Sequence, residues 1–115
     1  MNIFIGYAHT LEGLGSGAIG YINESKESRI ISDLVAKYLR EMGHTVTVTG
    51  IKRSSNYLSE LVSIANKGNY DLVVQIHFNA NVKTNNPMGT ETYYYSTDSK
   101  GKKIATQINN KLSTL

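Results

Sequence analysis

The 115-residue sequence predicts an α/β fold, a three-layer sandwich with a mostly parallel central sheet flanked by helices. Two observations support this class. Short apolar runs rich in β-branched residues alternate with longer segments whose apolar residues recur every three or four positions. Strands that alternate with helices in this way are typical of parallel sheets. The length allows one domain, which we expect to span residues 1–115.

The first half of the chain predicts two strands and one well-defined helix. Residues 2–7 are a short apolar run and predict the first strand, after which residues 8–22 form a long glycine-rich loop. Asn23 favours the N-cap position, and the three-to-four spacing of apolar residues predicts a helix from there to Gly43. The alternating, β-branched sequence "HTVTVTG" that follows predicts the second strand.

The second half repeats the alternation. Residues 54–56, "SSN", favour the start of a second amphipathic helix. The run "DLVVQIHFNA", residues 71–80, is almost continuously apolar, which predicts a central strand covered on both faces. "TETYYYS", residues 90–96, predicts a further strand, and the apolar spacing from Ser99 onward predicts a third helix.

Composition excludes several classes of site and partner. There is no cysteine, so any metal must be held by His, Asp or Glu. The net charge of +3 is spread among interspersed acids and does not indicate nucleic-acid binding. No apolar run approaches the ~20 residues that cross a bilayer, so we expect no membrane insertion. The start of the chain has no basic region followed by an apolar helix, so we expect no signal peptide.

The stretch "GLGSGAIG" contains a G-x-G-x-x-G pattern at Gly15, Gly17 and Gly20. In a dinucleotide-binding loop the first glycine ends the strand and the helix begins within the motif. Here the strand ends near Tyr7 and the helix begins near Asn23, so the spacing fits neither requirement. Nucleotide binding is therefore only a remote alternative.

Two histidines and a carboxylate are the candidate metal ligands. His9 and His77 lie near the ends of predicted strands, which parallel strands bring to one edge of a sheet, and Glu24 opens the first helix. Two imidazoles and a carboxylate, with a fourth position for water, make the donor set of a catalytic zinc site. Spacing alone also allows hydrogen-bonded histidines and a Glu24 that only favours the helix dipole. Glu27 is the rival carboxylate, and we expect His44 to be structural.

The order of motifs along the sequence resembles that of a known family. The resemblance covers essentially the whole chain, and the ordered series of motifs is more specific than any one of them. The sequence is similar to zinc-dependent N-acetylmuramoyl-L-alanine amidases of the amidase-3 type, which include catalytic domains of phage endolysins and bacterial autolysins. The motifs are Gly6-Tyr7-Ala8-His9, "SGAIG", "NE" at the start of the helix, "GHTVTVT", "SIAN", "VVQIHFNAN" and "GTETYYYS".

The resemblance implies a peptidoglycan hydrolase that cleaves the amide between N-acetylmuramic acid and L-alanine with zinc-activated water. It places the zinc ligands on His9, Glu24 and His77. Asn79 matches the family's "H-x-N" and is expected to order the edge of the site, although it is also an ordinary turn residue. Glu91 matches a commonly acidic position, where it faces either the substrate or solvent.

Two departures from the family pattern shape the expectations. Ala8 and Thr10 replace the glycines that usually flank the first ligand. The family's catalytic Glu lies on a last strand, which we expect beyond Leu115 together with a last helix, so no catalytic residue is identifiable in this chain. The alternative function is therefore a non-catalytic zinc-containing fragment that binds muropeptide or cell wall.

The resemblance also sets expectations for assembly and location. A sheet that lacks its last strand exposes an edge, so homo-oligomers are expected through that edge. We expect no cell-wall-binding domain in residues 1–115. The protein is expected to stay in the cytoplasm until it is released to the wall, as a phage endolysin or a non-classically exported autolysin.

Overall fold

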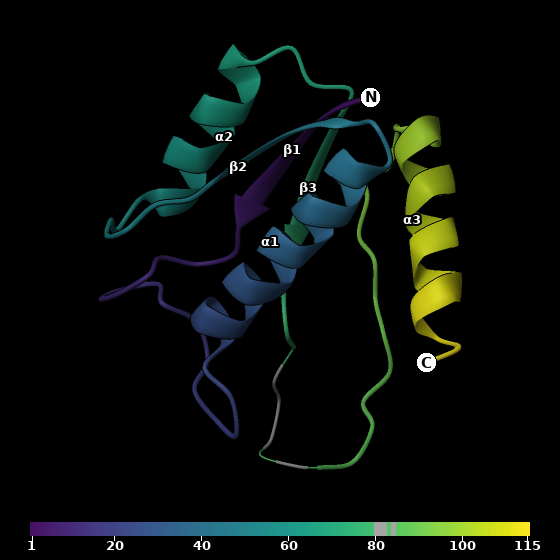
Figure 1. Ribbon diagram of the computed structural model, residues 1–115. Helices are drawn as coiled ribbons and strands as arrows, with labels where there is room; N and C mark the ends of the chain where they lie inside the picture. Colours follow the sequence, from purple (N-terminus) through teal and green to yellow (C-terminus); the bar gives the residue numbers. More distant parts are fainter. Residues whose placement is uncertain (80–82, 84) are drawn as a thin grey trace. The chain divides into compact units, whose positions relative to one another are not determined.

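The computed structural model describes residues 1–79, 83 and 85–115, which form two compact units. Residues 1–83 form the N-terminal unit and residues 84–115 the C-terminal unit. The elements of the N-terminal unit are β1 (Asn2–Tyr7), α1 (Glu24–Glu41), β2 (Thr45–Thr49), α2 (Tyr57–Lys67) and β3 (Leu72–Ile76), and the C-terminal unit contains α3 (Ser99–Leu112) (Figure 1).

The three strands form a parallel sheet in the order β2-β1-β3. In the register of the two pairs, Ile5 of β1 lies opposite Val48 of β2 and Val74 of β3. The predicted α/β class with a parallel sheet is therefore confirmed. The central strand is β1, and the prediction of a doubly covered central strand over residues 71–80 is wrong. Within the described residues β3 pairs with β1 alone, and its Val73 is 53% exposed.

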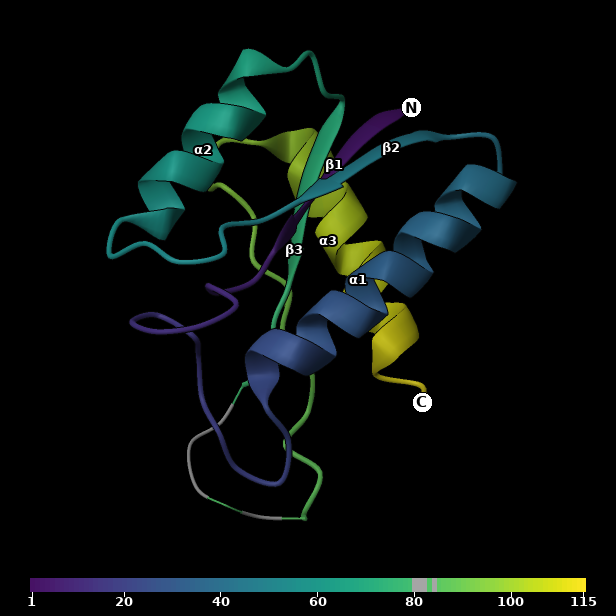
Figure 2. The ribbon, with the colours of Figure 1, turned by 60° about the vertical axis from the view of Figure 1, so that its left-hand side comes forward.

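Helices cover both faces of this sheet, which gives the N-terminal unit its three layers (Figure 2). Successive strand residues point to opposite faces. Ile3 and Ile5 of β1 share a buried cluster with Ala36 of α1. Phe4 packs on the ring of Tyr70, with ring centroids 5.1 Å apart. On that second face a Cβ at Gly6 would lie 2.8 Å from Leu61 Cδ2 of α2, so glycine allows α2 to approach the sheet closely.

The fully buried positions of α1 hold small residues, while its larger apolar residues Val35 and Leu39 pack on the core only partly buried. Ser25, Ser28, Ser32 and Ala36 are fully buried at three-to-four spacing. Exposed α1 residues include Ile30, Leu34 and Tyr38. The helix itself was predicted correctly, and Asn23 caps it by accepting a hydrogen bond from the Lys26 amide at 3.1 Å. Small residues let the helix backbone lie close to the sheet, and the helical period alone does not show which stripe is buried.

The start of α2 was also predicted correctly, but a different side chain organises it. Asn56 occupies the N-cap position without a side-chain cap hydrogen bond. Ser54 Oγ instead accepts from the Asn56 amide at 3.0 Å and donates to Glu60 Oε1 at 2.5 Å. These contacts fix the end of α2 at which Tyr57 begins the helix.

In the C-terminal unit, α3 begins as predicted. Its N-cap Asp98 accepts a hydrogen bond from the Gly101 amide at 2.8 Å. The predicted strand over residues 90–96 is wrong, because these residues form no strand ladder in the part of the chain that is described. A β-strand needs a neighbouring strand to accept and donate its backbone hydrogen bonds, and β-branched or aromatic composition alone does not supply one.

None of the helices in the described ranges combines the length and the apolar character that a membrane span requires.

Candidate metal centre

The three predicted ligands converge at one edge of the sheet. β1 and β3 are parallel neighbours, so their carboxyl ends lie at the same edge (Figure 1). His9 follows the end of β1 by two residues, His77 comes directly after β3, and Glu24 is the first residue of α1. One ligand atom from each of the three side chains lies within 4.8 Å of the others. We call these residues the His-Glu-His cluster.

The carboxylate of Glu24 is the centre of the cluster. Its Oε1 lies 2.9 Å from His9 Nε2 and 3.3 Å from His77 Nδ1. The same oxygen accepts a hydrogen bond from the Phe78 amide at 3.2 Å, and Oε2 accepts one from the Ala18 amide at 3.2 Å. Two backbone amides from different segments therefore fix the orientation of this carboxylate.

The surroundings of Glu24 favour its charged form. Burial raises the pKa of this carboxyl, but His9 and the amides of Ala18 and Phe78 lower it by more, so the net pKa lies below the ordinary value. Glu24 is therefore ionised at neutral pH, as a metal-binding carboxylate must be.

His9 presents a nitrogen whose hydrogen-bonding capacity is unused. Its Nε2 is buried and has no assigned hydrogen-bond partner among the described residues, and it lies 2.9 Å from the charged Glu24 Oε1. Buried polar atoms are rarely left without a partner. An unused imidazole nitrogen beside an ionised carboxylate fits a divalent metal, and two imidazoles with one carboxylate are a donor set that zinc accepts.

The glycine-rich loop packs directly against the cluster. Gly17 has a φ of +82°, and a Cβ there would lie 2.8 Å from His9 Cδ2 and 3.0 Å from Glu24 Oε2. Only glycine fits this conformation and this close approach. Gly15 also has a positive φ, +81°, and a Cβ there would lie 3.0 Å from Tyr57 Cε1. Gly17 therefore allows the loop to pack against the cluster, and Gly15 allows it to pack against Tyr57. No helix begins within the loop, whereas in a dinucleotide-binding motif the helix begins among the glycines.

His9 itself adopts a left-handed backbone conformation, with a φ of 62°. Such a conformation costs a non-glycine residue roughly 1–2 kcal/mol, so the surroundings must hold it. Arg29 Nη2 donates to the His9 carbonyl at 3.3 Å and to the Ile51 carbonyl at 3.4 Å. The Arg29 guanidinium lies over the Tyr7 ring, 4.5 Å from its centroid. Sequence reasoning missed Arg29 because nothing in the helical spacing shows which lysines and arginines turn inward.

A second set of supporting residues was also missed. Thr10 and Ser25 are fully buried, and Ser25 Oγ donates to the Thr10 carbonyl at 2.6 Å. Thr10 in turn donates from Oγ1 to the Leu14 carbonyl at 2.9 Å. Thr10 replaces one of the glycines expected beside the first ligand, and its hydroxyl is used to hold the loop. The serine stripe of α1 was the sequence signal that could have indicated this contact.

The remaining candidates lie outside the cluster. Glu27 is not a member of it, and Glu24 is. His44 precedes β2; its backbone amide donates to the Leu39 carbonyl at 3.0 Å, and its ring contacts the Met1 amine. Asn79 is exposed, three residues past the end of β3. Glu91 belongs to the C-terminal unit, where it accepts a hydrogen bond from the Tyr93 hydroxyl at 2.7 Å.

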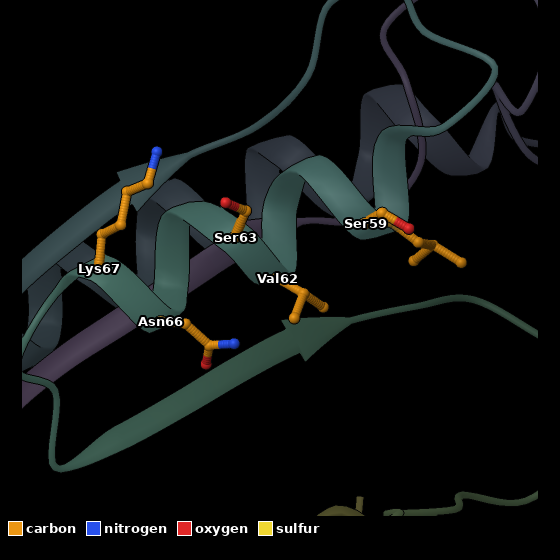
Figure 3. A pocket seen from close by; sticks show the side chains of 6 residues that line it. Ser59, Val62, Ser63, Asn66 and Lys67 are labelled. Atoms are coloured by element: carbon orange, nitrogen blue, oxygen red, sulfur yellow. The ribbon is translucent and has the colours of Figure 1, made fainter.

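A groove along α2 offers no alternative metal site. Its lining contains neither histidine nor a carboxylate. The residues that line it are Leu58, Ser59, Val62, Ser63, Asn66 and Lys67 (Figure 3).

Fold and site together define a parallel α/β protein with a candidate metal centre at the carboxyl edge of its sheet. The family model of N-acetylmuramoyl-L-alanine amidases matches residues 3–115, so the chain belongs to this family. The solved catalytic domain of the CD27L endolysin, described as targeting Clostridia Difficile, is similar in structure, with a TM-score of 0.79 and 32% sequence identity. That match covers 99% of this chain and 65% of the CD27L chain. No curated protein sequence matches.

The position of Gly17 generates a stability prediction. Gly17→Ala forces a left-handed φ on alanine and pushes its Cβ against His9 and Glu24, so we expect a loss of at least about 1–2 kcal/mol in the free energy of unfolding. Gly20→Ala is the matched control, since a Cβ at Gly20 has nothing within 4 Å. Urea denaturation measures both. Equal stability of the two variants would contradict the packing described for Gly17.

Tyr7 generates a prediction at alkaline pH. Burial and the hydrogen bond that its hydroxyl donates to Asp33 raise the pKa of Tyr7 from 10.0 to about 12. Between these two values the unfolded chain loses the Tyr7 proton and the folded chain keeps it, so stability must fall as pH rises. Tyr7→Phe removes this titrating hydroxyl, so the unfolding free energy of the variant is expected to fall less steeply from pH 10 to 12 than that of the wild type. Parallel slopes for both proteins would contradict the assignment.

Proposed function

We propose that this protein is a peptidoglycan hydrolase that cleaves the amide bond between N-acetylmuramic acid and L-alanine with zinc-activated water. One observation carries the proposal: His9, Glu24 and His77 bring their ligand atoms within 4.8 Å of one another in a chain of the N-acetylmuramoyl-L-alanine amidase family. The similarity to the CD27L endolysin domain supports a substrate in the bacterial cell wall.

The three side chains would hold the zinc ion through two imidazole nitrogens and one carboxylate oxygen. A zinc ion bound in this way lowers the pKa of a bound water and polarises the scissile carbonyl group. The protein supplies the orientation. Glu24 is fixed by the amides of Ala18 and Phe78, so this ligand is held in place before a metal arrives.

Access to the site is proposed to be from the side of His77. The His77 side chain is 39% exposed, against 19% for His9 and 9% for Glu24. Gly17 has no side chain that could cover His9 and Glu24, which suits a bulky glycopeptide substrate. Asn79 would order this open edge after β3.

A second candidate function is binding of muropeptide without cleavage. Among the described residues the cluster contains one carboxylate, Glu24, which serves as a ligand. Hydrolysis needs a separate general base as well, which typically contributes about 10² to 10⁴ in rate. We propose that the protein stays in the cytoplasm until it is released to the wall.

Metal analysis and a hydrolysis assay test the proposal together. We expect about one zinc per chain in the purified protein, and loss of that zinc in His9→Ala and His77→Ala. His44→Ala is the matched control and should keep the metal, since His44 lies outside the cluster. Protein that is fully folded, with zinc available, and still metal-free would contradict both candidate functions.

Release of new L-alanine amino groups from purified cell wall then separates hydrolysis from binding alone. If the general base is absent from residues 1–115, turnover should be weak or undetectable while muropeptide still binds in a zinc-dependent manner. Rapid turnover by the 115-residue chain would show that the residues needed for proton transfer are present in it.

The edge strand β3 is a candidate surface for self-association. β3 pairs with β1 alone within the described residues, and an unpaired strand edge promotes association with another chain. We expect reversible dimers at high concentration in light scattering. Val73→Lys should weaken them, because a charge on an edge strand opposes pairing, while Ser63→Lys on α2 adds the same charge elsewhere as the control. Monomer at all concentrations would contradict the proposal.

A further inference from the structure

The hydroxyl of Tyr57 lies beside the nitrogen of His9 that faces away from Glu24. Tyr57 Oη is 3.4 Å from His9 Nδ1, and the two ring centroids are 6.2 Å apart. The other ring nitrogen, Nε2, is 2.9 Å from Glu24 Oε1. The two nitrogens of His9 therefore have different neighbours: a neutral hydroxyl on one side and the carboxylate of the cluster on the other.

This arrangement suits a histidine that must bind a metal through one nitrogen only. A neutral imidazole carries its proton on one nitrogen and its free lone pair on the other, and the hydrogen bond at the first nitrogen determines which is which. A tyrosine hydroxyl can accept a hydrogen bond. If Nδ1–H donates to Tyr57 Oη, the lone pair remains on Nε2, which is the buried nitrogen without a hydrogen-bond partner among the described residues.

The position of Tyr57 is itself fixed by the loop that follows His9. The main chain of Gly15 lies so close to the Tyr57 ring that a Cβ there would be 3.0 Å from Cε1 and 3.2 Å from Cδ1. The Gly15 carbonyl accepts a hydrogen bond from the Thr10 amide at 3.2 Å, which ties the same loop back to the residue after His9. Tyr57 is also the first residue of α2, where Ser54 organises the helix start.

The second histidine of the cluster shows a similar division. His77 Nδ1 lies 3.3 Å from Glu24 Oε1, and His77 Nε2 lies 3.5 Å from Gln75 Oε1. In both histidines one nitrogen faces Glu24 and the other faces a neutral polar side chain. Gln75 is exposed, whereas Tyr57 is partly buried, so Tyr57 is the better-held partner of the two.

We propose that Tyr57 is a positioning residue, which fixes the tautomer and the ring orientation of His9 so that Nε2 is the metal-binding nitrogen. The inference rests on the proposed zinc site and extends it to a residue of α2 that the sequence motifs do not mark. Partners of this kind typically affect metal affinity about 10- to 100-fold.

The test uses Tyr57→Phe, which removes one oxygen atom and keeps the ring that packs against Gly15. Tyr38→Phe is the matched control: it removes a hydroxyl from an exposed tyrosine 14 residues along α1 from Glu24, about 21 Å at 1.5 Å per residue. Zinc affinity is measured by competition with a chelator, and the visible absorption spectrum of the cobalt(II)-loaded protein reports the ligand geometry. The denaturation midpoint of the metal-free protein is recorded for each variant.

We expect Tyr57→Phe to bind zinc about 10- to 100-fold more weakly and to give an altered cobalt spectrum, with an unchanged midpoint. Tyr38→Phe should match the wild type in all three measurements. Unchanged affinity, or weaker binding with an unchanged cobalt spectrum, would overturn the role of Tyr57 while leaving the zinc site intact. A wild-type protein that binds neither metal would overturn the zinc site itself, and the role of Tyr57 with it.

Discussion

The buried carboxylate of Glu24 joins segments that are far apart in the sequence. It contacts His9 after β1, accepts a hydrogen bond from Ala18 in the glycine-rich loop, and accepts another from Phe78 after β3. The parallel pairing of β1 with β3 makes this possible, because it brings both strand ends to one edge of the sheet. Without this carboxylate, His9 and His77 would lie close together with no opposite charge to balance a bound cation or to order the loop.

The glycine-rich loop packs directly against this carboxylate and the His9 ring. Gly17 gives the closest approach to His9 and Glu24, and Gly15 gives the approach to Tyr57. The same stretch resembles a phosphate-binding motif in sequence, but its backbone surrounds side chains of the protein. The strained φ of His9 belongs to the same arrangement, in which Arg29 holds the His9 carbonyl. Backbone strain at a functional site is common where the surrounding contacts compensate for it.

Much of the fold and the three members of the cluster were predictable from the sequence, because they follow from patterns within single segments and from one rule about parallel strands. Periodicity located α1 and β2, a short apolar run located β1, and the rule that parallel strands end at one edge brought His9 and His77 together. The tertiary features were not predictable in this way. Residues 90–96 have strand-like composition without a pairing partner among the described residues. The apolar run of β3, which predicted a central strand, forms an edge strand of the three-stranded sheet. Tyr57 and Arg29 reach His9 through packing between elements distant in sequence, which no spacing encodes.

The central claim is that His9, Glu24 and His77 together bind zinc. X-ray absorption spectroscopy at the zinc edge of the zinc-loaded protein tests it most directly, because it reports the number and kind of ligand atoms. The account predicts two imidazole ligands at about 2.0–2.1 Å and one carboxylate oxygen at a similar distance, with an exchangeable light atom in the remaining position. A zinc shell without two imidazoles, or one left unchanged by replacement of Glu24 with Gln, would contradict it.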